Sequence, residues 1–337
     1  MLLSRLHPSY YNTLLPTSFH ARSAPLRHHH VLDGAITVPV GRSAMSIQAR
    51  DSDPVVDVEA QPLKLLDRRA KLKIAIVGFG QFLARTFIAQ GHELLAYSRS
   101  DHSATAGSLG VAFFNDQHEL CEQHPDVVLV STSILSAEAV LRSLPIHHLH
   151  RSTLFVDVLS VKEFPRNLFL QRQTRHFDIL CTHPMFGPES GKHGCAGLPF
   201  VYDKVRIGDS DDGVERCRAF LEIFEREGCK MVEMSCAEHD ETAAEIQFLT
   251  HTIGRVLAKL DLKSTPINTK GYETLLNLVQ NTCRDSSDLY NGLFIYNKNS
   301  TELIEKLDVA MHAMKKELFG RLHGMLMKQL FESSDSK

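Results

Sequence analysis

The sequence predicts an α/β fold in which a doubly wound parallel sheet is followed by an all-helical domain. Short β-rich apolar runs alternate with amphipathic helical stretches up to about residue 234, a pattern typical of a parallel sheet covered by helices. From Cys236 onward, strand patterns give way to helical periodicity alone. A chain of 337 residues is also long enough for two domains of ordinary size.

The first 50 residues differ in composition from the rest of the chain. Asp33 is their single acidic residue, whereas arginine, serine, threonine and histidine recur throughout. Such a composition is typical of an organellar transit peptide, and a tail without a targeting role is the alternative. Residues 51–70 turn acidic and contain proline, as linkers do. We therefore expect a transit peptide at 1–50, a linker at 51–70, a nucleotide-binding domain at 71–235 and a helical domain at 236–325.

The composition of the chain indicates which kinds of binding partner are expected. Hydrophobic residues make up 43% of the chain and charged residues 23%, which is a globular balance. The net charge of −3 offers no electrostatic argument for a nucleic-acid partner, and no apolar run is long enough to cross a bilayer. Seven scattered cysteines without a CxxC pair indicate free thiols in a reducing compartment, and no metal site is expected.

A glycine turn follows the first apolar run of the predicted nucleotide-binding domain. The run at 73–77 leads into Gly78-Phe79-Gly80, and residues 81–90 have helical character. Strand, glycine turn and helix together form the context of a dinucleotide fingerprint, because the glycines allow a tight turn and close approach of backbone amides to a pyrophosphate. Leu83 stands where the third glycine of the fingerprint belongs.

The next predicted strand, at 93–97, indicates which dinucleotide is bound. It ends in Ser98-Arg99-Ser100, where an NAD site usually has an acidic residue. An arginine between hydroxyls suits the 2′-phosphate of NADP, so we predict NADP; an ordinary surface charge is the alternative. The predicted cofactor-binding residues, which include a polar cluster after the strand at 127–130, are Gly78, Phe79, Gly80, Gln81, Ser98, Arg99, Ser100, Ser131, Thr132 and Ser133.

Two further polar residues lie just past the ends of predicted strands. His183 follows the apolar run at 179–181 and is held in a segment rich in proline and glycine. Ser160 follows the strand at 153–156. Because open α/β sheets bind ligands at the carboxyl ends of their strands, both are candidate catalytic residues. The alternatives are a histidine packed in a turn and a serine that caps a helix.

The last part of the chain is predicted to be helical and to associate. Late strands at 200–207 and 230–234 flank a helix near 212–227, and helical periodicity then covers 237–260, 272–282 and 300–328. Long helices with large apolar faces and little sheet to cover them predict a homodimer. His239 and His251 lie on the first of these helices near one face, too far apart to share a metal, and structural roles are the alternative for both.

Four segments in this order resemble the prephenate/arogenate dehydrogenase family, and most of all its plant arogenate-specific members. They are VDVLSVKE at 156–163, THPMFGPESG at 182–191, EHD with QFLTHT at 238–252, and STPINTKGYETLL at 264–276.

The resemblance implies a Rossmann-like NADP-binding domain, a helical dimerisation domain and a plastid location. The implied reaction is the oxidative decarboxylation of L-arogenate to L-tyrosine and CO2. Prephenate dehydrogenase and a cofactor-blind, non-catalytic relative are the alternatives. In this family His183 matches the catalytic histidine and Ser160 its hydrogen-bonding partner, while the substrate-binding positions match His239, Gln247, His251 and Asp285.

Asp285 bears on substrate choice, and the sequence departs from the family in three places, one of which is Ser287 in place of a usual aromatic residue. A carboxylate near the substrate side chain favours the ammonium of arogenate over the keto group of prephenate; a helix N-cap is the alternative role. The plant pattern GFGNFGQFL is shortened to GFGQFL, a loss of three residues that is expected to weaken cofactor binding. Asn291 replaces an arginine of microbial members, so the substrate carboxylate needs another cation, for which the candidates are Arg255, Lys270 and Arg284.

Overall fold

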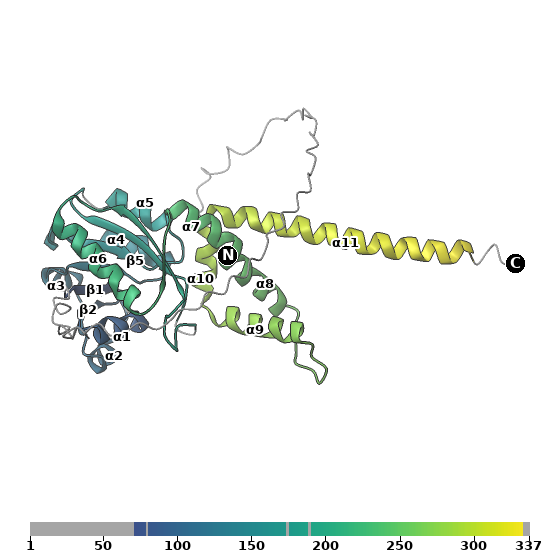
Figure 1. Ribbon diagram of the computed structural model, residues 1–337, viewed down its shortest axis with the longest axis horizontal. Helices are drawn as coiled ribbons and strands as arrows, with labels where there is room; N and C mark the ends of the chain where they lie inside the picture. The colour runs from purple at the N-terminus through teal and green to yellow at the C-terminus, as the bar shows by residue number, and fades with distance from the viewer. Residues whose placement is uncertain (1–70, 79, 173–174, 188–189, 333–337) are drawn as a thin grey trace, which may run out of the picture. The chain divides into compact units, whose positions relative to one another are not determined.

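The structure is a computed structural model that describes residues 71–78, 80–172, 175–187 and 190–332 (Figure 1). All of these residues belong to one compact unit, Leu63–Lys337. The predicted transit peptide at 1–50, the predicted linker at 51–70 and Phe79 lie outside the described residues.

An eight-stranded sheet has the order β3-β2-β1-β4-β5-β6-β7-β8. Every strand that the sequence predicts is present in it. The strands are β1 (Lys73–Val77), β2 (Glu93–Tyr97), β3 (Ala112–Phe114), β4 (Val127–Val130), β5 (Leu154–Asp157), β6 (Asp178–Pro184), β7 (Pro199–Arg206) and β8 (Lys230–Glu233).

One pair of neighbours departs from the predicted parallel arrangement. β6 and β7 are antiparallel, whereas all other neighbouring strands are parallel. A parallel connection needs a crossover over one face of the sheet, usually through a helix. The described residues between β6 and β7 contain no helix, and Met185 N–H donates to the Pro199 carbonyl at 3.0 Å. The chain therefore reverses at the carboxyl end of β6, directly after His183.

Alternate side chains of each strand pack on opposite faces of the sheet, as the period of a strand requires. Ile74 and Ile76 belong to one hydrophobic cluster, whereas Ala75 and Val77 belong to a second. The first cluster includes residues of α1 (Gln81–Ala89), α2 (Ser103–Ser108) and α6 (Asp211–Arg226). The second includes residues of α3 (Gln117–Glu122), α4 (Ile134–Ser143) and α5 (Glu163–Arg172). Helices on both faces make this a doubly wound sheet, as predicted.

Helices alone follow β8 in the described part of the chain. They are α7 (Cys236–Ala243), the π-helical turn η2 (Ala244–Phe248), α8 (Leu249–Ala258), α9 (Lys270–Arg284), α10 (Ser287–Ile295) and α11 (Lys298–Glu332). Ser235 and Glu238 form a capping box that starts α7, and Ser286 caps α10. The domain boundary predicted near residue 235 falls between β8 and α7, and it stays a prediction.

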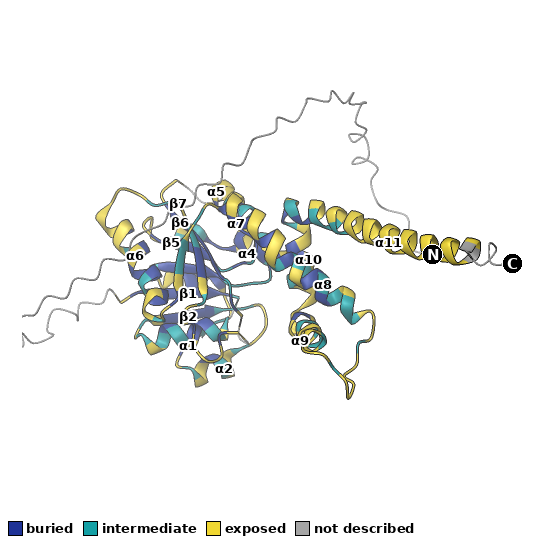
Figure 2. Cartoon of the chain, turned by 45° about the vertical axis from the view of Figure 1, so that its right-hand side comes forward, coloured by how far each residue is buried: buried dark blue, intermediate teal, exposed yellow. Residues whose placement is uncertain are grey.

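The core lies in the sheet and in the first turns of the helical part (Figure 2). All seven residues of β6 are buried, whereas α11 is exposed from Asp308 to its last described side chains. None of the described helices is both apolar and long enough to span a lipid bilayer.

Candidate active site

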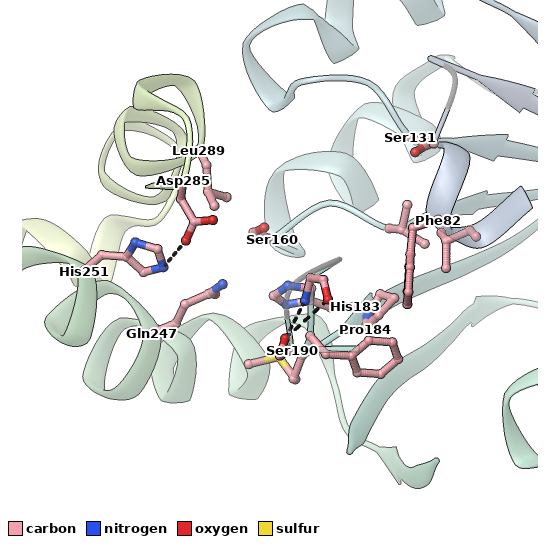
Figure 3. Close-up of a pocket in the computed structure, with 16 residues that line it drawn as sticks. Phe82, Ser131, Ser160, His183, Pro184, Ser190, Gln247, His251, Asp285 and Leu289 are labelled. Atoms are coloured by element: carbon pink, nitrogen blue, oxygen red, sulfur yellow. Dashed lines mark hydrogen bonds and ion pairs between the residues drawn. The ribbon is translucent and has the colours of Figure 1, made fainter. Parts of the chain in front are cut away.

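A cavity of about 450 Å³ opens between the carboxyl edge of the sheet and the helical part (Figure 3). On the sheet side it is lined by Gly80 at the start of α1, Ser131 after β4, Ser160 after β5 and His183 in β6. The residues that line it from the helical part are Gln247, His251, Asp285 and Leu289. The structure thus brings together residues that the sequence predicted separately for catalysis, cofactor binding and substrate binding.

His183 is the most buried titratable group of the cavity wall, with 4% of its surface exposed. Its Nδ1 lies 2.8 Å from Nε2 of His239. Burial lowers the pKa of His183 well below the ordinary 6.5, and the nearby His239 and Lys162 lower it further. The imidazole is therefore neutral at physiological pH and able to accept a proton or a hydrogen bond.

Ser160 lies on the cavity wall in the loop between β5 and α5. A buried ion pair holds this loop, because Lys162 Nζ contacts Asp157 Oδ1 and also donates to the Thr182 carbonyl at 2.6 Å. His183 accepts no hydrogen bond from Ser160 in the described structure, and His239 is the partner of its ring instead. The predicted pairing of Ser160 with His183 is therefore not present in this geometry, since Nδ1 of His183 is turned towards α7.

His239 was predicted to bind substrate, but the structure places it behind His183. It is 2% exposed, and its two ring nitrogens are directed at His183 and at Asp240. The π-helical turn η2 separates it from His251, which does line the cavity. The two histidines therefore do not act on one ligand from a shared helix face.

Gln247, His251 and Asp285 form a polar group on the helical side of the cavity. His251 Nε2 lies 3.6 Å from Asp285 Oδ2. Burial lowers the pKa of His251, and Arg255 adds to this decrease although Asp285 opposes it. Gln247 Oε1 and His251 Nδ1 are buried and have no hydrogen-bond partner among the described residues. Unpaired buried polar atoms that border a cavity are suited to a polar ligand.

The environment of Asp285 also decides between its two predicted roles. Ser286 is the N-cap of α10, whereas Asp285 follows the last residue of α9 and faces His251. The N-cap alternative for Asp285 is therefore wrong. Among the three candidate cations, Arg255 lies beside this segment, since its Nη2 donates to the Asp285 carbonyl at 3.2 Å. Lys270 and Arg284 are exposed on α9.

The glycine turn packs against the segment after β4. Gly78 has a φ of +85°, and a Cβ added there would lie 2.7 Å from the Thr132 backbone. A Cβ on Gly80 would lie 2.5 Å from Ser131 Oγ. Gly78 therefore requires glycine, whereas a side chain at Gly80 would require the Ser131 hydroxyl to rotate away.

The start of α1 has the properties of an anion site. Its N-cap, Gly80, contributes no side-chain hydrogen bond, and its first turn contains no acidic residue. The amides at this end border the cavity, where a helix N-terminus favours negative charge. A dinucleotide pyrophosphate fits this end of the cavity, with Gln81 exposed beside it.

The other predicted cofactor residues lie along the same edge of the sheet. Ser98, Arg99 and Ser100 follow β2, the neighbour of β1, and Arg99 Nη2 donates to Ser136 Oγ at 3.0 Å. Ser133 is directed at the helical part, because its hydroxyl donates to Asp288 Oδ2 at 3.3 Å.

The fold and the site define a class of protein. A dinucleotide turn, a neutral buried histidine at the end of a neighbouring strand and a polar helical wall form one cavity, as in a two-part nicotinamide-dependent dehydrogenase. Comparison with known proteins agrees. The model of the prephenate dehydrogenase nucleotide-binding domain matches residues 83–233, and that of the TYRAAT1-like C-terminal domain matches residues 256–330.

The particular family follows from two Arabidopsis thaliana relatives. The chain is 60% identical over 291 residues to the chloroplastic arogenate dehydrogenase 2, which covers 86% of this chain and 81% of that protein. It is 62% identical over 271 residues to the chloroplastic arogenate dehydrogenase 1, which covers 79% of this chain and 42% of that protein. The chain belongs to the arogenate dehydrogenase family and is an oxidoreductase. The plastid location predicted from the sequence is confirmed by these relatives.

Solved structures share the fold at lower identity. Prephenate dehydrogenase of A. aeolicus, in complex with hydroxyphenyl propionate and NAD+, has a TM-score of 0.60 at 18% identity and covers 79% of this chain and 96% of that one. Arogenate dehydrogenase of Synechocystis has a TM-score of 0.53 at 19% identity, with 79% and 100% covered. The predicted Rossmann-like fold is thereby confirmed.

Proposed function

We propose that this protein catalyses the NADP-dependent oxidative decarboxylation of L-arogenate to L-tyrosine and CO2. The observation that carries the proposal is the neutral, buried imidazole of His183. It lies in one cavity with the glycine turn on one side and the His251–Asp285 pair on the other. The proton acceptor, the dinucleotide turn and a carboxylate suited to an ammonium group are thereby all within reach of one small substrate.

The residues of the cavity supply what the reaction requires. When bound, the nicotinamide accepts the hydride that leaves the hydroxyl-bearing ring carbon, and loss of the ring carboxylate as CO2 then makes the ring aromatic. His183 accepts the hydroxyl proton as the hydride departs, and Ser160, on the same side of the cavity, orients that hydroxyl. A positioned general base of this kind contributes roughly 10²–10⁴-fold to the rate.

The substrate side chain is held by the helical wall. Arogenate carries an ammonium and a carboxylate there, whereas prephenate carries a keto acid. The carboxylate of Asp285 pairs with the ammonium, and the unpartnered Gln247 Oε1 is a second acceptor for it. Arg255, whose buried Nε has no partner in the described part of the chain, is the cation that we assign to the substrate carboxylate.

The choice of NADP over NAD rests on Arg99. The Arg99 side chain follows β2 at the cofactor edge, and its guanidinium is exposed and bound to a hydroxyl rather than to a carboxylate. A 2′-phosphate replaces Ser136 as its partner without any ion pair being broken. Arg99→Gln is expected to raise the KM for NADP and to leave that for NAD unchanged. Equal changes for both cofactors contradict this assignment.

The proposal of a homodimer is based on the exposed apolar side chains of α11. Its exposed half has large apolar side chains at helical spacing, among them Met311, Met314, Leu318, Leu322 and Met325. A stripe of this kind is normally covered by a partner, and a second copy of α11 has the matching surface. Light scattering of the full-length chain is expected to give twice the monomer mass, and a monomer contradicts the proposal.

A four-way assay tests the reaction itself. Purified protein is given arogenate or prephenate, each with NADP or NAD, and reduced cofactor and tyrosine are measured. Turnover is expected with arogenate and NADP, and His183→Asn is expected to remove most of it while dimer and cofactor binding persist. Preference for prephenate identifies a prephenate dehydrogenase instead. Failure of NADP to raise the thermal midpoint identifies a non-catalytic relative, because ligand at 100 times its Kd adds about 2.7 kcal/mol.

A further inference from the structure

Asp240 receives hydrogen bonds from three directions inside the protein. The backbone N–H of Lys162 donates to its Oδ1 at 2.7 Å, and the backbone N–H of Glu163 donates to its Oδ2 at 2.8 Å. His239 Nδ1 lies 2.8 Å from the same Oδ1. Asp240 is 1% exposed, and Asn297 Nδ2 fixes its backbone by donating to the Asp240 carbonyl at 2.7 Å.

The backbone donors set the direction of these hydrogen bonds. An N–H group can only donate, so both oxygens of Asp240 are acceptors, and backbone donors to both oxygens favour the ionised carboxylate. A carboxylate has no proton to give to His239. The contact between them therefore requires that His239 Nδ1 carries the proton and donates it to Oδ1. A neutral His239 then has its lone pair on Nε2, the nitrogen that faces His183.

We propose that Asp240 and His239 are positioning residues that fix the tautomer of His183. His239 Nε2 accepts from His183 Nδ1 across 2.8 Å, so the proton of the neutral His183 stays on Nδ1. The lone pair then resides on Nε2, the remaining nitrogen of a ring that lines the cavity. The backbone at the start of α5 thus determines, through two side chains, which atom of His183 accepts the substrate proton. This inference rests on the proposed function for the identity of the reaction.

The competing arrangement has a cationic His239. An imidazolium donates from both nitrogens, so His183 accepts at Nδ1 and carries its proton on Nε2, where it cannot act as a base. The Lys162–Asp157 pair is neutral as a whole, and the carboxylate of Asp240 is already stabilised by two backbone amides without a cation beside it. A second buried cation costs desolvation without gaining a new acceptor. The neutral chain of hydrogen bonds is the arrangement that these contacts favour.

Nitrogen NMR of the full-length chain reads the tautomers without substrate. Protein labelled with ¹⁵N in histidine is studied at neutral pH, and the signals of His183 and His239 are identified by their loss in His183→Asn and His239→Gln. Both rings are expected to show a protonated Nδ1 and an unprotonated Nε2. A protonated Nε2 on His183, or two protonated nitrogens on His239, overturns the proposal.

A matched pair of variants connects the tautomer to catalysis. His239→Gln places an amide oxygen near the position of Nε2 and keeps an acceptor for His183, whereas His239→Met has a similar size and no acceptor. His239→Met is expected to lower kcat by roughly 10- to 100-fold, by analogy with residues that orient metal-bound imidazoles, with KM little changed. His239→Gln is expected to retain most of kcat. Equal losses in two variants that both fold by circular dichroism contradict the proposal.

Different results would contradict the proposed reaction and the proposed tautomer of His183. A chain without turnover on arogenate overturns the proposed function, while the imidazole signals still decide the tautomer. An active chain whose His183 carries its proton on Nε2 overturns only the role given to Asp240 and His239.

Discussion

His251 and Asp285 face each other across 3.6 Å, and only one of them is enclosed. The side chain of His251 is 9% exposed, whereas that of Asp285 is 46% exposed. The histidine therefore holds one side of the carboxylate and leaves its other side open to the cavity. A second cationic group is able to approach there.

Asp285→Asn is expected to change substrate preference. The variant keeps the shape of the side chain and loses its charge, so kcat/KM for arogenate falls by roughly 10- to 100-fold, as for one hydrogen bond to a charged group. The value for prephenate, which has no ammonium, stays level or rises. Steady-state assays with both substrates measure this. Asp261→Asn, at an exposed carboxylate, is the control, and equal losses on both substrates contradict the assignment.

Activity is expected to persist in mildly acidic solution. His183 must be unprotonated to accept a proton, and its pKa is well below 6.5 because the ring is buried near His239 and Lys162. The pKa of His251 is lowered as well, so neither ring of the cavity gains charge near pH 6.5. The profile of kcat/KM for arogenate should remain flat through pH 6.5 and decline only below it. A midpoint at or above 6.5 contradicts this prediction.

The free energy of unfolding, unlike activity, is expected to decrease as soon as the solution becomes mildly acidic. A histidine with a lowered pKa binds its proton in the unfolded chain first, so the free energy of unfolding decreases as pH falls below 6.5. For a ring as buried as His183 the slope approaches about 1.4 kcal/mol per pH unit. Urea titrations between pH 7 and 5 measure it. His183→Asn should show a smaller slope than the parent, and identical slopes exclude His183 as the cause.

Removal of only one partner of the ion pair between Lys162 and Asp157 is expected to destabilise the protein strongly. Both side chains are at most 1% exposed, and burial raises the pKa of Asp157 although Lys162 opposes this. Lys162→Met leaves the carboxylate without a counter-ion and is expected to cost about 3–5 kcal/mol of unfolding free energy. The double variant Lys162→Met with Asp157→Leu should recover much of that loss. Chemical denaturation checks both, and a double variant no better than the single contradicts the account.

Lengthening the glycine turn should improve cofactor binding. Phe82 lines the cavity, packs edge-on against Phe186 at 6.3 Å and leaves no room for a side chain at Gly191. Insertion of Asn-Phe-Gly after Gly80 restores the GFGNFGQFL pattern and moves the start of α1 away from this contact. The Kd for NADP, measured by titration calorimetry, is expected to decrease. Insertion of three alanines is the control, and an equal gain there excludes the pattern as its cause.

The central strands β1, β4, β5 and β6 were predictable because their apolar runs are buried on both faces, and the glycine turn and His183 were predictable because they lie at the ends of such runs. The direction of β7 was not, since an apolar run has the same appearance in either orientation. Helix α10 was also missed. Gly292 interrupts its pattern, and only the structure shows that a side chain there would collide with Ile134 of α4.

The predicted members of the site came mainly from the resemblance, and their arrangement required tertiary packing. Nothing local indicates that His239 contacts His183, because 56 positions separate them and a π-helical turn changes the helix face that follows. Lys162 is a residue type that normally stays in water, so its burial against Asp157 was not expected from its sequence context. The capping of α5 by Asp240 joins segments that are 78 positions apart.

Strand β6 is hydrogen-bonded to β5 on one edge and to β7 on the other, and all seven of its residues are buried. His183, the proposed proton acceptor, therefore lies on a strand that is paired on both edges and fully buried. Adaptation to ligands of different size or charge falls to Gln247, His251 and Asp285, which stand on helices and at helix ends. Substitutions in that helical wall can accordingly change substrate specificity without moving His183, which is fixed by the sheet.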